Sequence, residues 1–237
     1  MVERLLEKGA DIAAATPAGI SALSMAVRGC HDPVIKLLVD RGADAKISLD
    51  GGVSLPMIAA ETCGESTVRL LLTAGIPVNT PDQRGRTALW YAASRGDAPI
   101  VSALLSARAD QTVGDRDGTT ALLAALQNGR AEAASLLLDR GAEVERRTPA
   151  GNTPLILAAQ AGLEEIVEYL LRQGAKCDIK NNQGYTALMI AARAGRIDIV
   201  RTLINAGADR YLRNRKRETA GDIALALGHA SIAQMLK

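Results

Sequence analysis

The chain contains no phenylalanine, and Phe, Trp and Tyr together make up only 2% of its 237 residues. A core without large aromatic side chains must be filled by Leu, Ile, Val and Ala, which suits thin helices packed at short distance. No apolar run approaches the roughly 18 residues that a membrane-spanning helix needs. The start, Met-Val-Glu-Arg, has no hydrophobic signal segment. We therefore expect a cytoplasmic protein in a reducing, intracellular compartment, without contact to a membrane.

Motifs of catalysis are also missing. The sequence has no Gly-Lys-Ser/Thr phosphate loop and no Gly-x-Ser-x-Gly nucleophile elbow. A catalytic histidine would need a neighbouring nucleophile and an orienting acid, and neither His31 nor His229 has such a setting in the sequence. The formal net charge of +2 is too small to indicate a partner. We predict that the chain is not an enzyme and that it binds no cofactor and no metal.

What the sequence does contain is a repeat. Two series of glycines run along the chain with a period of 33 residues, the first at Gly19, Gly52, Gly85, Gly118, Gly151 and Gly184, the second at Gly9, Gly42, Gly75, Gly141, Gly174 and Gly207. Two glycines at fixed positions of a repeated unit indicate two places that need an unusual backbone conformation or a close approach of the chain. The protein should therefore be a stack of similar units.

Each unit also repeats a short motif. In the same register the chain has Ser21-Ala22-Leu23, Thr87-Ala88-Leu89, Thr120-Ala121-Leu122, Thr153-Pro154-Leu155 and Thr186-Ala187-Leu188. The unit resembles the ankyrin repeat, which has 33 residues and a Thr-Pro-Leu-His-x-Ala core. The motif proline is in place only at Pro154, and no unit keeps the motif histidine. The resemblance covers nearly the whole chain.

The residues of one unit predict two helices. Thr186 suits the N-cap of a first helix that begins with Ala187 and Leu188. After a short turn, apolar residues from Ile197 to Ile204 recur at helical spacing and predict a second helix. Gly207 follows this helix, where a left-handed residue commonly ends a helix.

The register sets the expected boundaries. We predict an N-terminal half repeat with only a second helix (1–15), six full repeats, and a truncated C-terminal capping repeat (214–237). The full repeats are 16–48, 49–81, 82–114, 115–147, 148–180 and 181–213. The resemblance implies an all-α, ankyrin-repeat solenoid of stacked helix-turn-helix units, joined by hairpin-like loops.

The resemblance also implies a non-catalytic scaffold for protein–protein interaction, a monomer that binds its partner on a concave face of hairpin tips and first helices. On this chain the face comprises Gln83, Arg84, Arg86, Trp90, Arg95, Arg116, Asp117, Thr119, Asn128, Asn152, Asn182, Tyr185, Arg193, Arg215 and Lys216. Its middle is rich in Arg, which binds carboxylates in bidentate fashion. An acidic protein partner is therefore favoured, and Arg84, Arg86 and Arg116 should be solvated charges whose reversal leaves the fold intact.

Two aromatic residues and one basic cluster leave alternatives open. Tyr91 is expected in the core, whereas Trp90 is either a core residue or an interface anchor. The cluster at Arg210, Arg213, Arg215, Lys216 and Arg217 is a solvated finger or a site for nucleic acid or an acidic tail. A further alternative is that the chain is the targeting module of a larger enzyme.

Cysteine chemistry is predicted to be absent. Cys30 and Cys63 occupy equivalent positions of adjacent units, whose helices should lie about 8–10 Å apart. A disulfide needs Cα atoms within about 7 Å, so both are expected to be free thiols, like Cys177. We also expect the unit at 49–81 to be the least stable, because Pro56 removes a helical donor and Cys63 replaces a glycine.

Overall fold

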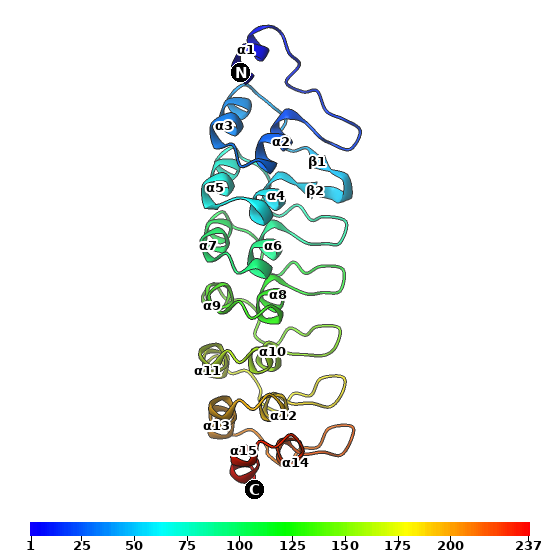
Figure 1. Cartoon of the computed structure of the whole chain (residues 1–237), viewed down its shortest axis with the longest axis vertical. Helices are drawn as coiled ribbons and strands as arrows, with labels where there is room; N and C mark the ends of the chain where they lie inside the picture. Colours follow the sequence, from blue (N-terminus) through cyan, green and yellow to red (C-terminus); the bar gives the residue numbers. More distant parts are fainter. The chain divides into compact units, whose positions relative to one another are not determined.

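In the computed structural model, which describes residues 1–237, the chain forms two compact units, 1–116 and 117–237. The N-terminal unit contains α1 (Val2–Glu7) and three helix pairs (Figure 1). These are α2 (Ala22–Arg28) with α3 (Asp32–Asp40), α4 (Leu55–Thr62) with α5 (Glu65–Thr73), and α6 (Ala88–Arg95) with α7 (Ala98–Ser106). First helices α2, α4 and α6 pack on each other in sequence, as do second helices α3, α5 and α7.

The C-terminal unit contains four further pairs of the same kind. They are α8 (Ala121–Gln127) with α9 (Ala131–Asp139), α10 (Pro154–Ala161) with α11 (Glu164–Arg172), α12 (Ala187–Arg193) with α13 (Ile197–Asn205), and α14 (Ala220–Ala226) with α15 (Ala230–Met235). The chain thus forms seven helix pairs after a lone helix, and the expected all-α solenoid is confirmed. None of the helices is long and apolar enough to cross a membrane.

Hydroxyl side chains begin the first helices. The Oγ1 atoms of Thr87, Thr153 and Thr186 each accept a hydrogen bond from the backbone N–H three residues later, which satisfies a donor that the helix itself leaves unpaired. The residues that follow are small and apolar, and in α12 every residue from Ala187 to Ala192 is buried. The repeated Ser/Thr-Ala-Leu motif therefore marks the start of a buried helix, as predicted.

A second polar position, five residues before each N-cap, closes the hairpin between copies. Asp82 Oδ1 accepts the N–H groups of Arg84 and Arg86, both at 2.8 Å. Asn181 and Asn214 do the same with the N–H groups two and four residues later, at distances of 2.9–3.0 Å. A short oxygen-bearing side chain thus holds each loop in a tight turn.

Leu49 occupies this hairpin-closing position in the second copy and has no acceptor. There the loop is closed by backbone pairing instead, in which β1 (Ser48–Leu49) pairs antiparallel with β2 (Val53–Ser54) around the short 3₁₀ turn η1 (Asp50–Gly52). Gly51 and Gly52 both have positive φ, 83° and 76°, as a tight two-strand turn requires. β1 and β2 form the chain's one two-stranded sheet.

Five pairs of successive hairpin tips are linked by single backbone hydrogen bonds, whereas Pro149, at the donor position of its tip, has no N–H to donate. In each case an N–H of one tip donates to a carbonyl of the preceding tip at 2.7–3.3 Å: Asp50 to Ala18, Gln83 to Gly51, Arg116 to Arg84, Asn182 to Ala150, and Arg215 to Gln183. These bonds hold neighbouring loops in the same register as the helices behind them.

The two glycine series differ in what they require. At Gly184 φ is +83°, and a Cβ atom would lie 2.8 Å from the backbone N of Arg215 in the next hairpin. At Gly174 φ is +84°, but a Cβ atom would meet nothing within 4 Å. Apart from Gly118, the hairpin series therefore needs both a left-handed backbone and room for the next loop, whereas the series after the second helices needs the conformation alone.

The prediction of free thiols at Cys30 and Cys63 is wrong. The two residues form a disulfide, and their Cα atoms lie 5.5 Å apart. The 8–10 Å spacing applies to helix axes, whereas these cysteines lie in the turns after α2 and α4. Cys63 also leaves the left-handed conformation of its counterparts, with φ −110°. Cys177 is the remaining free cysteine.

The reasons given for instability of residues 49–81 are also wrong. Ser54 is the N-cap of α4, so Pro56 falls within the first turn, where no helical partner for an N–H exists. Cys63 has negative φ and carries no left-handed penalty. The positive φ of 53° occurs instead at Cys30, in the preceding copy.

The glycine comparison gives a matched test. Gly184→Ala and Gly174→Ala should each cost about 1–2 kcal/mol for a left-handed alanine. Gly184→Ala should cost roughly 1–3 kcal/mol more, because the methyl group overlaps the next hairpin. Urea unfolding of both variants measures the difference, and equal midpoints would show that the close approach carries no energetic weight.

Candidate functional site

The hairpin tips and the exposed sides of α2, α4 and α6 form one face of the N-terminal unit, here called the tip face. It contains a groove of about 470 Å³. The groove has an apolar floor formed by Ala18, Ile20, Leu49, Val53 and Ile58. Ile20 remains 37% exposed, so apolar surface in this groove is open to solvent.

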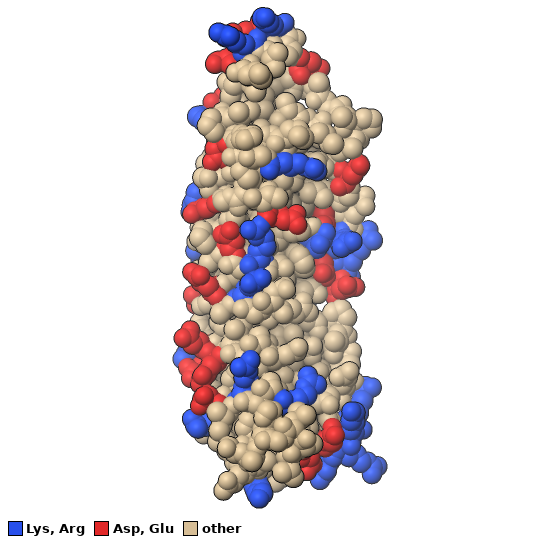
Figure 2. Space-filling model, viewed as in Figure 1, with Lys and Arg blue, Asp and Glu red and all other residues tan.

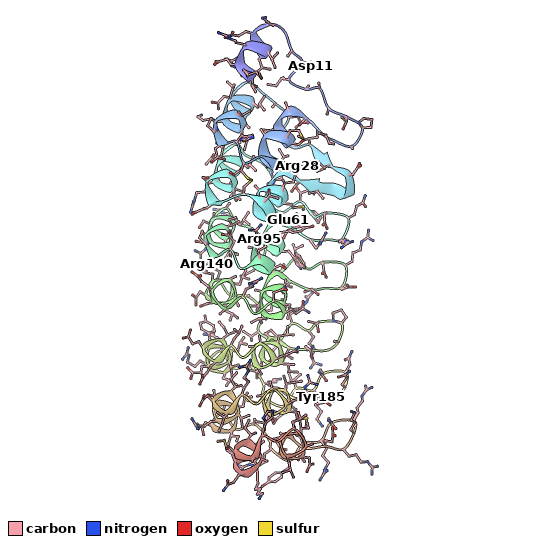
Figure 3. All side chains as sticks on the ribbon, in the orientation of Figure 1. Asp11, Arg28, Glu61, Arg95, Arg140 and Tyr185 are labelled. Carbon is pink, nitrogen blue, oxygen red and sulfur yellow. A yellow bond between two sulfur atoms is a disulfide. The ribbon has the colours of Figure 1, made fainter.

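Charged side chains border the groove. Arg28 and Glu61 lie at the ends of α2 and α4, and Asp50 lies on the hairpin tip between these helices. Figure 3 shows Arg28, Glu61 and Arg95 coming from three successive first helices on the same side of the unit. Arg28, Asp50 and Glu61 form no ion pair with each other or with other side chains, so their charges are available to a bound molecule.

Three predicted arginines also lie on the tip face with free side chains. Arg84 and Arg116 are on successive hairpin tips, Arg95 ends α6, and all three are exposed. Their guanidinium groups form no hydrogen bond or ion pair within the chain. Gln83 is exposed beside Arg84. On the face shown in Figure 2, Lys and Arg side chains gather over the hairpins of this unit.

Arg86 behaves differently from the other predicted arginines. Its Nε and Nη2 atoms donate to Asp82 Oδ2 at 3.0 and 2.8 Å, and only 20% of its side chain is exposed. Tyr91 donates its hydroxyl to the same oxygen at 2.9 Å. The guanidinium of Arg86 lies 4.7 Å from the ring centre of Tyr91 and 5.4 Å from that of Trp90. The prediction that Arg86 is a solvated charge is therefore wrong.

Trp90 and Tyr91 pack beside this ion pair. Their rings meet edge to face with centroids 5.5 Å apart, and both residues are half-buried. Trp90 Nε1 is buried and has no hydrogen-bond partner. Both rings therefore pack against the Arg86–Asp82 pair at the base of the hairpin, and Tyr91 is half-buried and does not belong to the fully buried core.

The environment of Asp82 shifts two pKa values. Burial alone would raise the pKa of Asp82, but hydrogen bonds from Arg86, Tyr91 and Arg84 outweigh burial and hold the pKa below its ordinary value. Burial and the hydrogen bond to Asp82 raise the pKa of Tyr91 to about 12. Asp82 is thus charged, and Tyr91 neutral, at physiological pH.

In the C-terminal unit the predicted site residues are mainly amides engaged with the backbone or with each other. Asn152 Oδ1 accepts from Asn181 Nδ2 at 2.8 Å, and Asn182 Nδ2 donates to the carbonyl of Pro149 at 2.8 Å. Asn128 Nδ2 donates to the carbonyl of Ala124 at 2.8 Å. These amides contribute to hairpin and helix structure.

The remaining predicted residues of this unit fall into two groups. Tyr185 is half-buried beneath the guanidinium of Arg193, which is exposed and lies 5.2 Å from the ring centre. Asp117 is exposed. Thr119, by contrast, is 6% exposed, so it belongs to the packed base of its hairpin and not to an accessible surface.

The basic cluster near the C-terminal end is partly neutralised. Arg213 Nη1 donates to the carbonyl of Arg217 at 2.6 Å and lies 3.9 Å from Asp222 Oδ2. Arg215 and Lys216 are exposed. Three or more His, Cys, Asp or Glu side chains that could hold a metal ion do not come together anywhere in the chain.

Arg28 and Glu61 are not among the site residues predicted from the sequence. Arg28, Glu61 and Arg193 share one position of the 33-residue unit, and only Arg193 was chosen. The same spacing would have found the other two. The apolar floor of the groove had no comparable signal, because Ile20 and Ile58 are equally compatible with burial in the core.

Comparison with known proteins agrees with this architecture. The family described as "Ankyrin repeats (3 copies)" matches residues 1–82, 55–148 and 145–214. The chain belongs to the ankyrin repeat family. The ankyrin repeat domain of Bcl-3, described as a unique member of the IkappaB protein family, is 30% identical to it with a TM-score of 0.77. That alignment covers 91% of this chain and 99% of the Bcl-3 domain.

A second ankyrin repeat protein shares the fold. The human ASB11 ankyrin repeat domain has a TM-score of 0.81 and 24% identity, over 92% of this chain and 98% of that domain. No curated protein sequence matches this ankyrin repeat chain. Ankyrin repeat domains are generally protein–protein interaction modules, and the chain shares this protein-binding character.

The contacts of Asp82 with Arg86 and Tyr91 predict a contribution to the free energy of unfolding that depends on pH. Asp82→Ala should lower the free energy of unfolding by about 3 kcal/mol, because Arg86 loses its partner. Asp82→Asn should cost less than half as much, since an amide oxygen still closes the hairpin, as Asn181 does. Chemical denaturation measures both.

The sign of the pH effect follows from the lowered pKa of Asp82. The extra stability of the wild type over Asp82→Asn should be fully present above the unfolded-state pKa, near 3.9. It should disappear as the pH falls through the lower folded-state value. A stability difference that is independent of pH between neutral and acid would contradict the assigned ion pair.

Proposed function

We propose that this ankyrin repeat chain is a non-catalytic recognition module that binds an acidic segment of a protein partner on the tip face of its N-terminal unit. The proposal is supported by two features of the same unit: the groove with an open apolar floor, and three exposed arginines on the following hairpin tips and at the end of α6 that have no partner inside the chain. Apolar contact supplies binding energy, and unpaired guanidinium groups supply selectivity for carboxylates.

The tip face offers such a partner charged donors that the predicted amides of the C-terminal unit do not. Arg84, Arg95 and Arg116 have free guanidinium groups, whereas Asn152 and Asn182 use their amides in hairpin bonds. An extended acidic segment could place an apolar side chain over Ile20 and Ile58 and carboxylates near the arginines. Glu61 and Asp50 would then exclude segments that carry acid directly over the groove.

Charge reversal at two tips tests the proposal. Arg84→Glu combined with Arg116→Glu should reduce partner capture at least about tenfold, a loss of roughly 1.4 kcal/mol or more. Arg86 is left unchanged because it pairs with buried Asp82. Thermal unfolding should be nearly unaffected, since exposed charges contribute little to stability. The readout is quantitative mass spectrometry of proteins retained from a cell extract by each immobilised variant.

A matched control carries the same change of charge elsewhere in the N-terminal unit. Lys36→Glu with Arg69→Glu reverses two exposed charges on α3 and α5, where each forms only a solvent-exposed pair. Proteins lost with the tip variant but retained by the control would support the proposal. Equal loss with both variants, or with neither, would contradict it.

A further inference from the structure

The Cys30–Cys63 disulfide lies at the edge of the proposed binding groove. Cys30 follows α2 two residues after Arg28, and Cys63 directly follows Thr62, and both Arg28 and Thr62 line the groove. Cys63 is 8% exposed, whereas Cys30 is half-buried. One sulfur is therefore shielded while the other is within reach of a small molecule in solution.

The fold does not require a side chain at the position in the turn after the first helix that Cys30 and Cys63 occupy. The five later copies have glycine there, at Gly96, Gly129, Gly162, Gly195 and Gly228, all with positive φ. Cys30 keeps this left-handed conformation at φ 53°, which costs a residue with a Cβ atom on the order of 1 kcal/mol more than glycine. Glycine would adopt the turn's backbone conformation at lower energy. The presence of two cysteines is therefore explained by the chemistry of their sulfur atoms.

The surroundings of the pair accommodate the reduced form as well. The carbonyl oxygen of Val27 lies 3.0 Å from Cys63 Sγ, and that of Thr62 lies 3.5 Å from Cys30 Sγ. After reduction each thiol could donate to a carbonyl of the neighbouring copy. Each sulfur would then keep a polar partner, so opening the bond does not require the copies to separate.

We propose that Cys30 and Cys63 are a reversible modification site, a thiol–disulfide pair that controls the rigidity of the groove. The role as a control of partner binding rests on the proposed function. The chemistry needs a small-molecule disulfide as oxidant, such as oxidised glutathione. The more exposed Cys30 is the attacking residue, and Cys63 completes the bond.

The oxidation takes place in two thiol–disulfide exchange steps that conserve electrons and protons. The Cys30 thiolate attacks one sulfur of the small disulfide, forms a mixed disulfide and releases one small thiolate. The Cys63 thiolate then attacks Cys30 Sγ, forms the intramolecular bond and releases the second small thiolate. The two protons of the cysteine thiols pass to the two released thiolates. Both cysteines are oxidised and one small disulfide is reduced to two thiols.

The closed bond ties the end of α2 to the end of α4. Arg28 and Glu61, which precede the two cysteines, are then held at a fixed separation across the groove. In the reduced state only packing and thiol hydrogen bonds join these turns. Residues 18–63 should therefore open more often when the pair is reduced, and a flexible groove binds its partner less tightly than a preorganised one.

The test uses the full chain in glutathione buffers of graded ratio. Alkylation followed by mass spectrometry measures the fraction of Cys30 and Cys63 that is bonded. Hydrogen exchange should show residues 18–63 protected on the order of 30-fold more in the oxidised form than in the reduced form. Residues 148–205 should exchange equally in both forms.

Two variants separate this effect from misfolding. Cys30→Gly restores the residue found in the later copies, so it should fold and lose the redox response, whereas Cys177→Ser should keep it. A pair that stays reduced throughout the glutathione range would overturn the proposal, as would equal exchange of residues 18–63 in both forms. Neither the alkylation nor the hydrogen-exchange measurement uses a partner protein. The thiol–disulfide result therefore stands or falls separately from the charge-reversal experiment.

Discussion

The close approach of neighbouring hairpin tips is the constraint that sets the register of most copies. One N–H of a tip reaches a carbonyl of the preceding tip, and the hairpin glycine provides both the left-handed backbone and the space for this approach. The buried first helices begin immediately after these hairpins, so their alanines are placed in contact by the same register. Short side-chain oxygens such as Asp82 Oδ1 complete the turn from within. Tip geometry therefore rests mainly on backbone atoms and on the side-chain oxygens that close the turns.

Residues that act within one copy could be predicted from the sequence. The left-handed glycines, the threonine N-caps and the paired helices all follow from local backbone chemistry repeated at a fixed spacing. Residues whose role depends on a neighbour in space could not. Arg86 has the sequence position of a solvated tip charge, and only the fold shows that Asp82 is buried beneath it. Thr119 is likewise next to an exposed glycine turn in the sequence, yet it is packed in the structure.

The disulfide shows a further limit of reasoning from spacing. Equivalent positions in adjacent copies are expected to lie one helix spacing apart, but that distance assumes equal backbone conformations. Cys30 and Cys63 break the assumption, with φ values of 53° and −110°, and their Cα atoms approach to 5.5 Å. A sequence can reveal that two residues are equivalent, but not that one of them has left the common conformation.

The two copies that depart most from the repeat are also those that form the groove. Leu49 cannot close its hairpin with an oxygen, and backbone pairing of β1 with β2 replaces that function. The side chain of Leu49 does not accept backbone N–H groups as Asp82 does in the next copy, and it forms part of the apolar floor of the groove. The cysteines likewise replace a glycine turn beside the same groove. Both departures therefore lie at the groove in which we propose that the partner binds.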